Sequence, residues 1–306
     1  MTDDARREFE RLLAEIRPKL HRYCARMTGS AVDGEDIVQD TMIKAVDALS
    51  SVGVVDNPAG WLFRIAHNTA LDLLRRQSRE PTMQPEEELN MVAVEDPPEQ
   101  GDEIAATSLR TFMRLPPLQR SAVILKDVLG HSIEEAASIT GATPAAVKSA
   151  LQRGRERLRQ FAAEPADLCL QILSDDMRAR LTTYVNGFRT GNFDAVRRML
   201  AEDVKLDLVG KFSAQGKGTV GEYYGRYAAA AERWAYAAGV VDGRPAMLVY
   251  DRHVSLETPA YFVALRFEGD RVVSVHDFLF ARYAMEGCPV DAIVGELPAR
   301  PVPPSS

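Results

Sequence analysis

Hydrophobic residues recur every three or four positions through the first quarter of the chain, which is the spacing of amphipathic helices. The first helix is predicted over residues 9–27, with Pro18 as a kink or break and Gly29 as its end. A second helix is predicted after Asp33, and a third covers residues 60–76. Together these helices predict an all-α module over residues 1–79.

A second helical pattern lies between residues 115 and 161. A helix begins at Ile133, and Gly141 interrupts it where a tight turn requires a residue that tolerates positive φ. Thr143 is placed to cap the next helix, and Pro144 suits its first turn. This is the helix-turn-helix layout, in which the second helix enters the DNA major groove.

The second helix of this motif is also strongly basic. Between residues 144 and 160 it carries five basic residues and one acid, Glu156, so its charge is 5 − 1 = +4. The basic residues are Lys148, Arg153, Arg155, Arg157 and Arg159. A solvated amphipathic helix would explain the charge, but not the turn, the cap and the apolar spacing together. We therefore predict DNA binding here, in a module over residues 104–165.

Residues 80–103 connect the two modules. They contain nine acidic residues, four prolines and no Lys or Arg. Like charges and prolines predict an extended, self-repelling tether. Mimicry of nucleic acid and the role of a plain spacer are equally compatible with this composition.

The pattern changes after residue 165. Helices are predicted over residues 177–189, 193–200 and 218–231, and an alternating strand over 204–208. Four strands of an antiparallel meander follow, over residues 235–241, 246–250, 260–267 and 272–283. The sequence therefore predicts an α+β domain over residues 174–284 and a proline-rich tail over 285–306.

Composition limits the kinds of partner. The net charge is −7, so any DNA contact must come from local basic surfaces. The three cysteines, Cys24, Cys169 and Cys288, form neither a disulfide framework nor a zinc-binding pattern. There is no signal-peptide core and no apolar run long enough to span a membrane. We expect a cytoplasmic protein without metal or cofactor.

Three stretches in this order carry a family resemblance: GEDIVQDT, NPAGWLFRIAHNTALDLLRRQSR and LPPLQRSAVILKDVLGHSIEEAASITGATPAAVKSALQRGRERL. They resemble the extracytoplasmic-function sigma-70 family of RNA polymerase sigma factors. The resemblance implies sigma region 2 in residues 1–79 and region 4 in residues 104–165. It implies core RNA polymerase (the β′ clamp helices and the β flap) and promoter DNA as partners. Gly154 departs from the pattern, because alanine is expected there and glycine weakens a helix by about 1 kcal/mol.

The resemblance also implies three sets of site residues. The surface that meets the β′ clamp helices contains Asp36, Gln39 and Asp40, on a predicted helix face that also carries Glu35. The −10 element is recognised and opened by the loop 50–57 and by Trp61, Asn68, Asp72, Arg75 and Arg76. The −35 element is bound by Thr143, Lys148, Ser149, Gln152 and Arg153.

Residues 176–284 resemble a SnoaL-like domain of the cone-shaped nuclear-transport-factor type. Relatives of this fold include cyclases, isomerases and silent binding domains, so the fold does not decide function. Four aromatic residues line a pocket for a small ligand or simply form the core: Tyr224, Trp234, Tyr261 and Phe278. The candidates for acid–base chemistry are Asp251, His253, His276 and Asp277. His276 and Asp277 are neighbours in a strand, so their side chains point to opposite faces.

We therefore expect a non-enzymatic sigma subunit whose fused C-terminal domain tunes promoter opening or polymerase affinity. One alternative is a stand-alone helix-turn-helix regulator whose C-terminal half senses a metabolite, and the GWLFRIAHN segment argues against it. The other is a SnoaL-like isomerase or cyclase with a DNA-binding arm, which requires turnover that depends on Asp251 or Asp277.

Overall fold

The computed structural model describes residues 3–52, 55–77, 104, 107–162, 173–288 and 290–293. The predictions for the tether 80–103, and for Cys169, lie outside these residues. The chain forms two compact units, residues 1–167 and 168–306, and each is described by itself. None of the described helices combines the length and the apolar character that crossing a bilayer requires.

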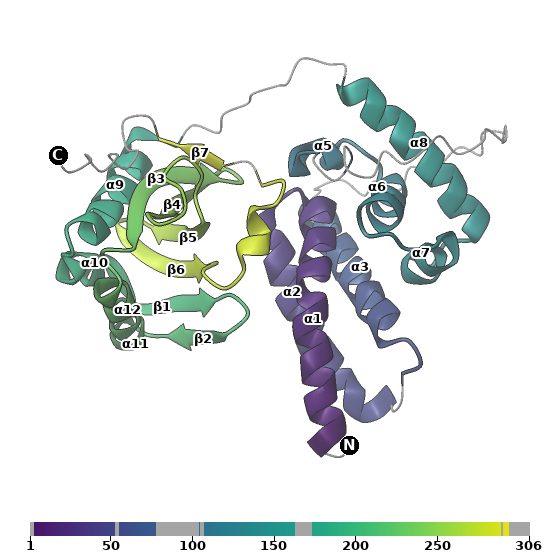
Figure 1. Ribbon diagram of the computed structural model, residues 1–306, viewed down its shortest axis with the longest axis horizontal. Helices are drawn as coiled ribbons and strands as arrows, with labels where there is room; N and C mark the ends of the chain where they lie inside the picture. Colours follow the sequence, from purple (N-terminus) through teal and green to yellow (C-terminus); the bar gives the residue numbers. More distant parts are fainter. Residues whose placement is uncertain are drawn as a thin grey trace. The chain divides into compact units, whose positions relative to one another are not determined.

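The N-terminal unit begins with three helices: α1 (Asp3–Thr28), α2 (Ala31–Val52) and α3 (Pro58–Gln77) (Figure 1). α1 continues through Pro18, so the predicted break is absent. Ile16 and Leu20, on either side of the proline, are both buried in the core, and this packing outweighs the hydrogen bond that proline removes. Gly29 ends the helix with a φ of 75°, as the sequence predicted.

The same unit continues with the helix-turn-helix part. Its elements are α5 (Leu109–Met113), α6 (Pro117–Val123), the π-helix η1 (Ile124–Val128), α7 (Ile133–Thr140) and α8 (Pro144–Ala162). Ser132 and Glu135 form a capping box at the start of α7. Gly141 makes the turn with a φ of 73°, and Thr143 Oγ1 accepts the Ala146 N–H at 3.2 Å. The helix-turn-helix prediction is confirmed in its turn and cap.

One hydrophobic core runs through both helical parts of this unit. Leu20 and Phe63 belong to it from the first part, and Phe112, Ile124 and Leu151 from the second. The guanidinium of Arg120 is buried and donates to the carbonyl oxygens of Met27, Met113 and Leu115. The sequence predicted two separate modules, but the structure packs them as one body, because each part leaves apolar residues that the other covers.

The C-terminal unit is a sheet with helices on one side (Figure 1). Its helices are α9 (Asp175–Arg189), α10 (Phe193–Met199), α11 (Lys217–Tyr223), α12 (Gly225–Ala229) and the 3₁₀ helix η2 (Arg282–Met285). Its strands are β1 (Leu200–Leu208), β2 (Phe212–Gln215), β3 (Trp234–Val241), β4 (Arg244–Asp251), β5 (Tyr261–Glu268), β6 (Arg271–Asp277) and β7 (Val290–Ala292).

The described strands follow the order β2-β1-β6-β5-β4-β3-β7. β3 to β6 form the predicted antiparallel meander, whereas β1 joins β6 in parallel. β6 ends at Asp277 instead of continuing to 283, since the Asp277 carboxylate accepts the Leu279 N–H and turns the chain. β7 lies within the stretch predicted as a tail. The predicted fold class, helical domains followed by an α+β domain, is confirmed.

Candidate nucleic-acid interface

The exposed face of α8 carries the residues expected to contact the −35 element. Lys148 and Gln152 are exposed, and Ser149 and Arg153 are half-buried beside them. Val147 and Leu151 are buried on the opposite side and fix this face outward. Thr143 is exposed just before the helix, where its hydroxyl oxygen serves as the cap. The predicted set therefore lies together at the first half of α8.

Two of the basic residues of α8 have structural partners instead. Arg155 forms a two-point ion pair with Asp127 of η1, with Nε–Oδ2 at 2.9 Å and Nη2–Oδ1 at 2.6 Å. Arg157 Nη1 donates to Gln119 Oε1 at 3.1 Å. The positive charge predicted for α8 is thus partly used to attach the helix to η1 and α6.

The exposed face of α3 carries most of the residues expected to contact the −10 element. They share a single stripe with Arg64 and are all exposed: Asn68, Asp72, Arg75 and Arg76. Arg75 Nη1 lies 3.2 Å from Asp72 Oδ1 on the surface. Trp61 is half-buried and packs against the core, so it does not belong to the exposed stripe.

A buried histidine holds α3 in this orientation. The hydroxyl of Tyr23, in α1, lies 2.7 Å from His67 Nδ1. Burial lowers the pKa of His67 to about 4, and the charge of Arg75 acts in the same direction. His67 is therefore neutral at neutral pH and acts as a structural hydrogen-bonding partner. Phe63, one turn earlier, contacts His131 edge-to-face, with ring centroids 5.0 Å apart.

The surface expected to meet the polymerase lies on α2. Asp36 and Asp40 are exposed and Gln39 is half-buried, on one side of the helix. Two aliphatic side chains continue this side and are about half exposed, Ile43 at 54% and Val46 at 53%. The spacing of apolar residues along this helix places Val46 on the buried side with Ala45, whereas the structure exposes Val46. The run of small and aliphatic residues near it gave no signal that would separate the two faces.

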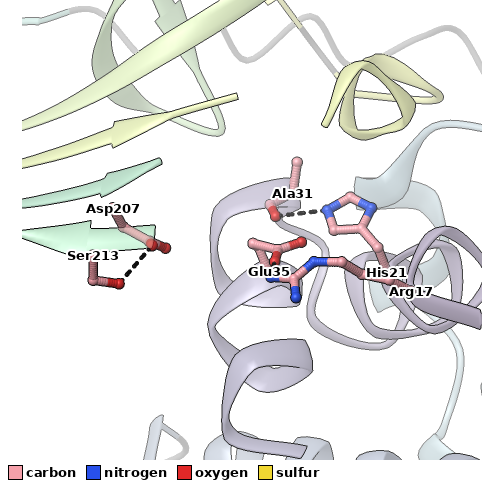
Figure 2. A network of polar contacts seen from close by, with 6 residues as sticks. All are labelled: Arg17, His21, Ala31, Glu35, Asp207 and Ser213. Atoms are coloured by element: carbon pink, nitrogen blue, oxygen red, sulfur yellow. Dashed lines mark hydrogen bonds and ion pairs between the residues drawn. The ribbon is translucent and has the colours of Figure 1, made fainter. Parts of the chain in front are cut away.

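Glu35 is a correction to that surface. Its side chain is buried and paired with Arg17 of α1, and nearby His21 Nε2 lies 3.0 Å from the Ala31 carbonyl oxygen (Figure 2). These contacts join α2 to α1, and a cation from α1 compensates the buried carboxylate. Glu35 is therefore excluded from the exposed acidic face, whereas its neighbour Asp36 remains on it.

In the C-terminal unit a buried carboxylate lies among tyrosines. Tyr223 donates to Asp277 Oδ2 at 2.8 Å, Tyr227 donates to the same oxygen, and Tyr261 donates to Tyr227. Burial raises the pKa of Asp277, and the hydrogen bonds oppose that rise. His276 pairs with Ala264 on the other face of the sheet, as expected for adjacent strand residues. The geometry provides no Asp–His pair for acid–base chemistry at this position.

Three of the four aromatics considered for a pocket, Tyr224, Trp234 and Tyr261, belong to one buried aromatic cluster that also contains Phe188 and Tyr227. Tyr224 hydrogen-bonds Tyr184 at 2.8 Å, and Trp234 contacts Tyr261 edge-to-face at 5.4 Å. Phe278 stacks on Phe262, with centroids 4.2 Å apart, on the face of the sheet opposite Asp277. Phe278 is therefore set apart from the other three aromatics, which pack together in the core.

Asp251 likewise has a structural role. It is buried, and it accepts hydrogen bonds from Arg233 Nη2 at 2.8 Å and from the backbone N–H of His253 at 3.1 Å. These bonds lower the pKa of Asp251. Across the described residues, no group of three His, Cys, Asp or Glu side chains is arranged to hold a metal ion.

Two family models match the N-terminal unit. The family model "Sigma-70 region 2" matches residues 12–80, and "Sigma-70, region 4" matches residues 109–158. Of the solved structures, the Mycobacterium tuberculosis extracytoplasmic function sigma factor SigJ aligns with a TM-score of 0.34 at 23% identity, covering 88% of this chain and 94% of that one.

Two curated relatives come from the same organism. ECF RNA polymerase sigma factor SigG of M. tuberculosis is 27% identical over 317 residues, which cover 90% of this chain and 82% of the relative. ECF RNA polymerase sigma factor SigM of M. tuberculosis is 35% identical over 153 residues, which cover 50% of this chain and 76% of the relative. This chain therefore belongs to the extracytoplasmic-function (ECF) RNA polymerase sigma factors, the subunits that direct core polymerase to promoters.

Proposed function

We propose that α8 reads the −35 element, that the exposed stripe of α3 reads and opens the −10 element, and that α2 binds core RNA polymerase. The observation that carries the proposal is the presence of two exposed polar stripes, on α3 and on α8, in a member of this family. Basic side chains on each stripe provide affinity through phosphates, and Asn68 and Gln152 provide hydrogen bonds to base edges. This activity lies where the polymerase is, in the cytoplasm, and needs no catalytic residue.

The α2 surface supports the polymerase contact by its composition. Exposed carboxylates of Asp36 and Asp40 favour a basic partner, and the half-exposed Ile43 and Val46 add apolar area beside them. An apolar centre next to charged residues is the usual anatomy of a protein–protein interface. We propose that these residues contact the β′ clamp helices together.

The packed state of the N-terminal unit must open when both promoter elements are bound. Elements at −35 and −10 are about 25 base pairs apart, or roughly 85 Å along the duplex. The longest described helix, α1, has 26 residues and is about 39 Å long. The connection from Gln77 to Leu109 is long enough to span the difference at about 3.3 Å per residue. We propose that polymerase binding separates the two helical parts and thereby opens the hydrophobic core that they share.

The experiment is transcription reconstituted with core RNA polymerase on a promoter that the full chain recognises. Lys148→Ala with Gln152→Ala is expected to lower initiation by roughly tenfold or more and to relax −35 specificity. Asn68→Ala is expected to leave duplex binding intact and to slow promoter opening. Arg159→Ala is the matched control, because Arg159 pairs with Glu156 late in the same helix. A folded protein that gives no promoter-specific initiation would contradict the proposal.

The opening step has its own test. Ala59→Cys and Ser138→Cys place thiols on α3 and α7, both lining a cavity of about 280 Å³ between these helices. A short bifunctional maleimide is expected to join the helices and abolish initiation, while either single variant stays active. Full activity of the cross-linked protein would show that separation is not required.

A further inference from the structure

One corner of the C-terminal sheet brings exposed aromatic rings and cations together. β1 and β6 are parallel neighbours, with Leu208 opposite Asp277, so the segments that follow them lie side by side. The Val209 N–H donates to the Asp277 carbonyl oxygen at 3.0 Å and fixes this arrangement. Lys211 Nζ consequently lies 5.0 Å from the ring centroid of Phe280. We call Lys211, Phe212, Arg226 and Phe280 the aromatic–cation corner.

Both phenylalanines of this corner are exposed. Phe280 is 52% exposed and Phe212 is 39% exposed, although each belongs to a unit with a well-filled core. Phe212 contacts Tyr223 edge-to-face at 6.2 Å, and the Arg226 guanidinium lies 5.8 Å from the Phe212 centroid. The rings are therefore held in place by neighbours, while a large part of each faces solvent.

No carboxylate of the described residues pairs with either cation of the corner. Within the residues that the structure describes, neither Lys211 nor Arg226 takes part in an ion pair. Elsewhere in the same unit, Arg180, Arg197 and Lys217 each do. Asp207, in the strand that leads to the corner, accepts the Ser213 hydroxyl at 2.9 Å. The positive charge of the corner is left available for an external anion.

This combination of groups selects the class of ligand. An apolar protein surface would cover the rings but would desolvate two unpaired cations, which costs free energy. A free phosphate would use the cations and leave the rings exposed. An unpaired nucleic-acid strand satisfies both, because bases stack on aromatic rings and phosphates pair with Lys and Arg. A duplex keeps its base faces stacked inside, so its phosphates could pair with the cations but the rings would gain no stacking partner.

We propose that the aromatic–cation corner binds single-stranded DNA, with unpaired bases on Phe212 and Phe280 and phosphates on Lys211 and Arg226. The source of that strand, the opened promoter, rests on the proposed function; the binding itself does not. The C-terminal unit thereby gains a direct role: it holds one strand of the opened DNA and delays reannealing.

The test uses the full chain and a single-stranded oligodeoxynucleotide that carries 5-bromodeoxyuridine. Because α3 and α8 also bind DNA, the readout is local: ultraviolet cross-links mapped to peptides that contain residues 211–226 or 278–282. Phe280→Leu is expected to lower cross-linking at the corner by at least about fivefold, whereas Phe280→Trp keeps or raises it. Lys211→Gln with Arg226→Gln removes two phosphate contacts. The salt dependence of single-stranded DNA binding is therefore expected to weaken, by about 1.4 in the slope of log K against log salt concentration.

Val254→Ala is the control, since Val254 is 80% exposed on the β4–β5 connection. Thermal unfolding of each variant verifies that it is folded. Cross-links confined to the N-terminal unit, equal behaviour of Leu and Trp at position 280, or equally strong corner binding of duplex DNA would overturn the proposal. If the corner fails in these ways while promoter-specific initiation persists, the proposed function stands. If initiation fails while the corner still cross-links, only the proposed function falls.

Discussion

At the scale of single residues, Gly154 illustrates how packing reverses a propensity argument. A Cβ at this position would lie 2.7 Å from Val123 Cγ2 and 3.1 Å from the Gln119 carbonyl oxygen. α8 nevertheless continues through Gly154 to Ala162. The glycine is there because α8 and α6 approach closely, not because the helix ends.

Gly154→Ala is therefore expected to lower the free energy of unfolding by about 1–3 kcal/mol, despite the better helix propensity of alanine. Gly218→Ala is the matched control, because Gly218 lies in α11 and a Cβ added there would meet no neighbouring atom within 4 Å. That variant is expected to be neutral or up to about 1 kcal/mol more stable. Chemical denaturation measures both. A Gly154→Ala protein as stable as the parent would contradict the packing argument.

His67 makes stability depend on pH. Its folded pKa of about 4 lies below the ordinary value of 6.5, so the unfolded chain binds the proton more tightly. The stability that neutral His67 contributes is fully present above pH 6.5 and is lost as the pH falls toward 4. The free energy of unfolding is expected to fall by roughly 2 kcal/mol between pH 7.5 and pH 5. Burial also lowers the pKa of His131, which makes stability depend on pH in the same sense.

The check is urea denaturation at both pH values for the parent and for His67→Gln, which keeps an acceptor for the Tyr23 hydroxyl. The variant is expected to lose less stability on acidification than the parent does. An identical pH dependence in the two proteins would show that His67 is not the group responsible.

At the scale of elements, the Arg155–Asp127 pair attaches α8 to η1. Both side chains are largely buried, and the two contacts are short. Asp127→Asn is expected to destabilise the N-terminal unit by about 3 kcal/mol, because it removes the carboxylate charge from a largely buried ion pair. Glu156→Gln breaks the exposed pair with Arg159 and is expected to change stability by less than about 1 kcal/mol. Thermal unfolding that ranks the two variants equally would refute the assignment.

The elements also show what periodicity conveys. The helices of the first half and the cap and turn of α7–α8 were predictable, because apolar spacing and Gly141 report local conformation directly. β2 has no buried side chain and β7 has only three residues, so neither strand has an alternating pattern to detect. Glu35 was misplaced because its compensating cation, Arg17, lies one helix earlier in the chain. Helical spacing thus locates most residues of an exposed face, whereas a buried ion pair such as Arg17–Glu35 depends on a partner distant in sequence.

At the scale of the whole molecule, the chain divides at residues 167 and 168. A protein that ends at residue 167 is expected to fold, to bind core polymerase and to start transcription, with shorter-lived open complexes than the full chain. A pull-down with core polymerase and a competitor-challenge assay of open-complex lifetime measure these properties. If the truncated protein no longer bound core polymerase, the C-terminal unit would contribute to polymerase affinity and not to promoter opening.

The association of the two helical parts could not be predicted from sequence, because each part has its own apolar stripes and a complete set of motifs. Contacts such as Phe63 with His131 involve one residue from each part, 68 positions apart in sequence. No periodic signal records such a pairing. The sequence thus predicts the two helical parts and the faces expected to meet DNA, whereas the packing of the two parts required the structure.

The buried Arg120 has a consequence for hybrid factors. Its guanidinium, whose pKa burial lowers only to about 10, stays charged and binds the Met27 carbonyl oxygen at the end of α1. Gly29 lies two residues further along the chain. The Met113 side chain packs so closely against it that a Cβ added at position 29 would collide with Met113 Cγ. A chimera that replaces the first helical part with that of another sigma factor is expected to disturb these contacts unless residues 27–29 and 113–120 come from the same parent. The packing between the two helical parts therefore limits how freely parts of different sigma factors can be exchanged.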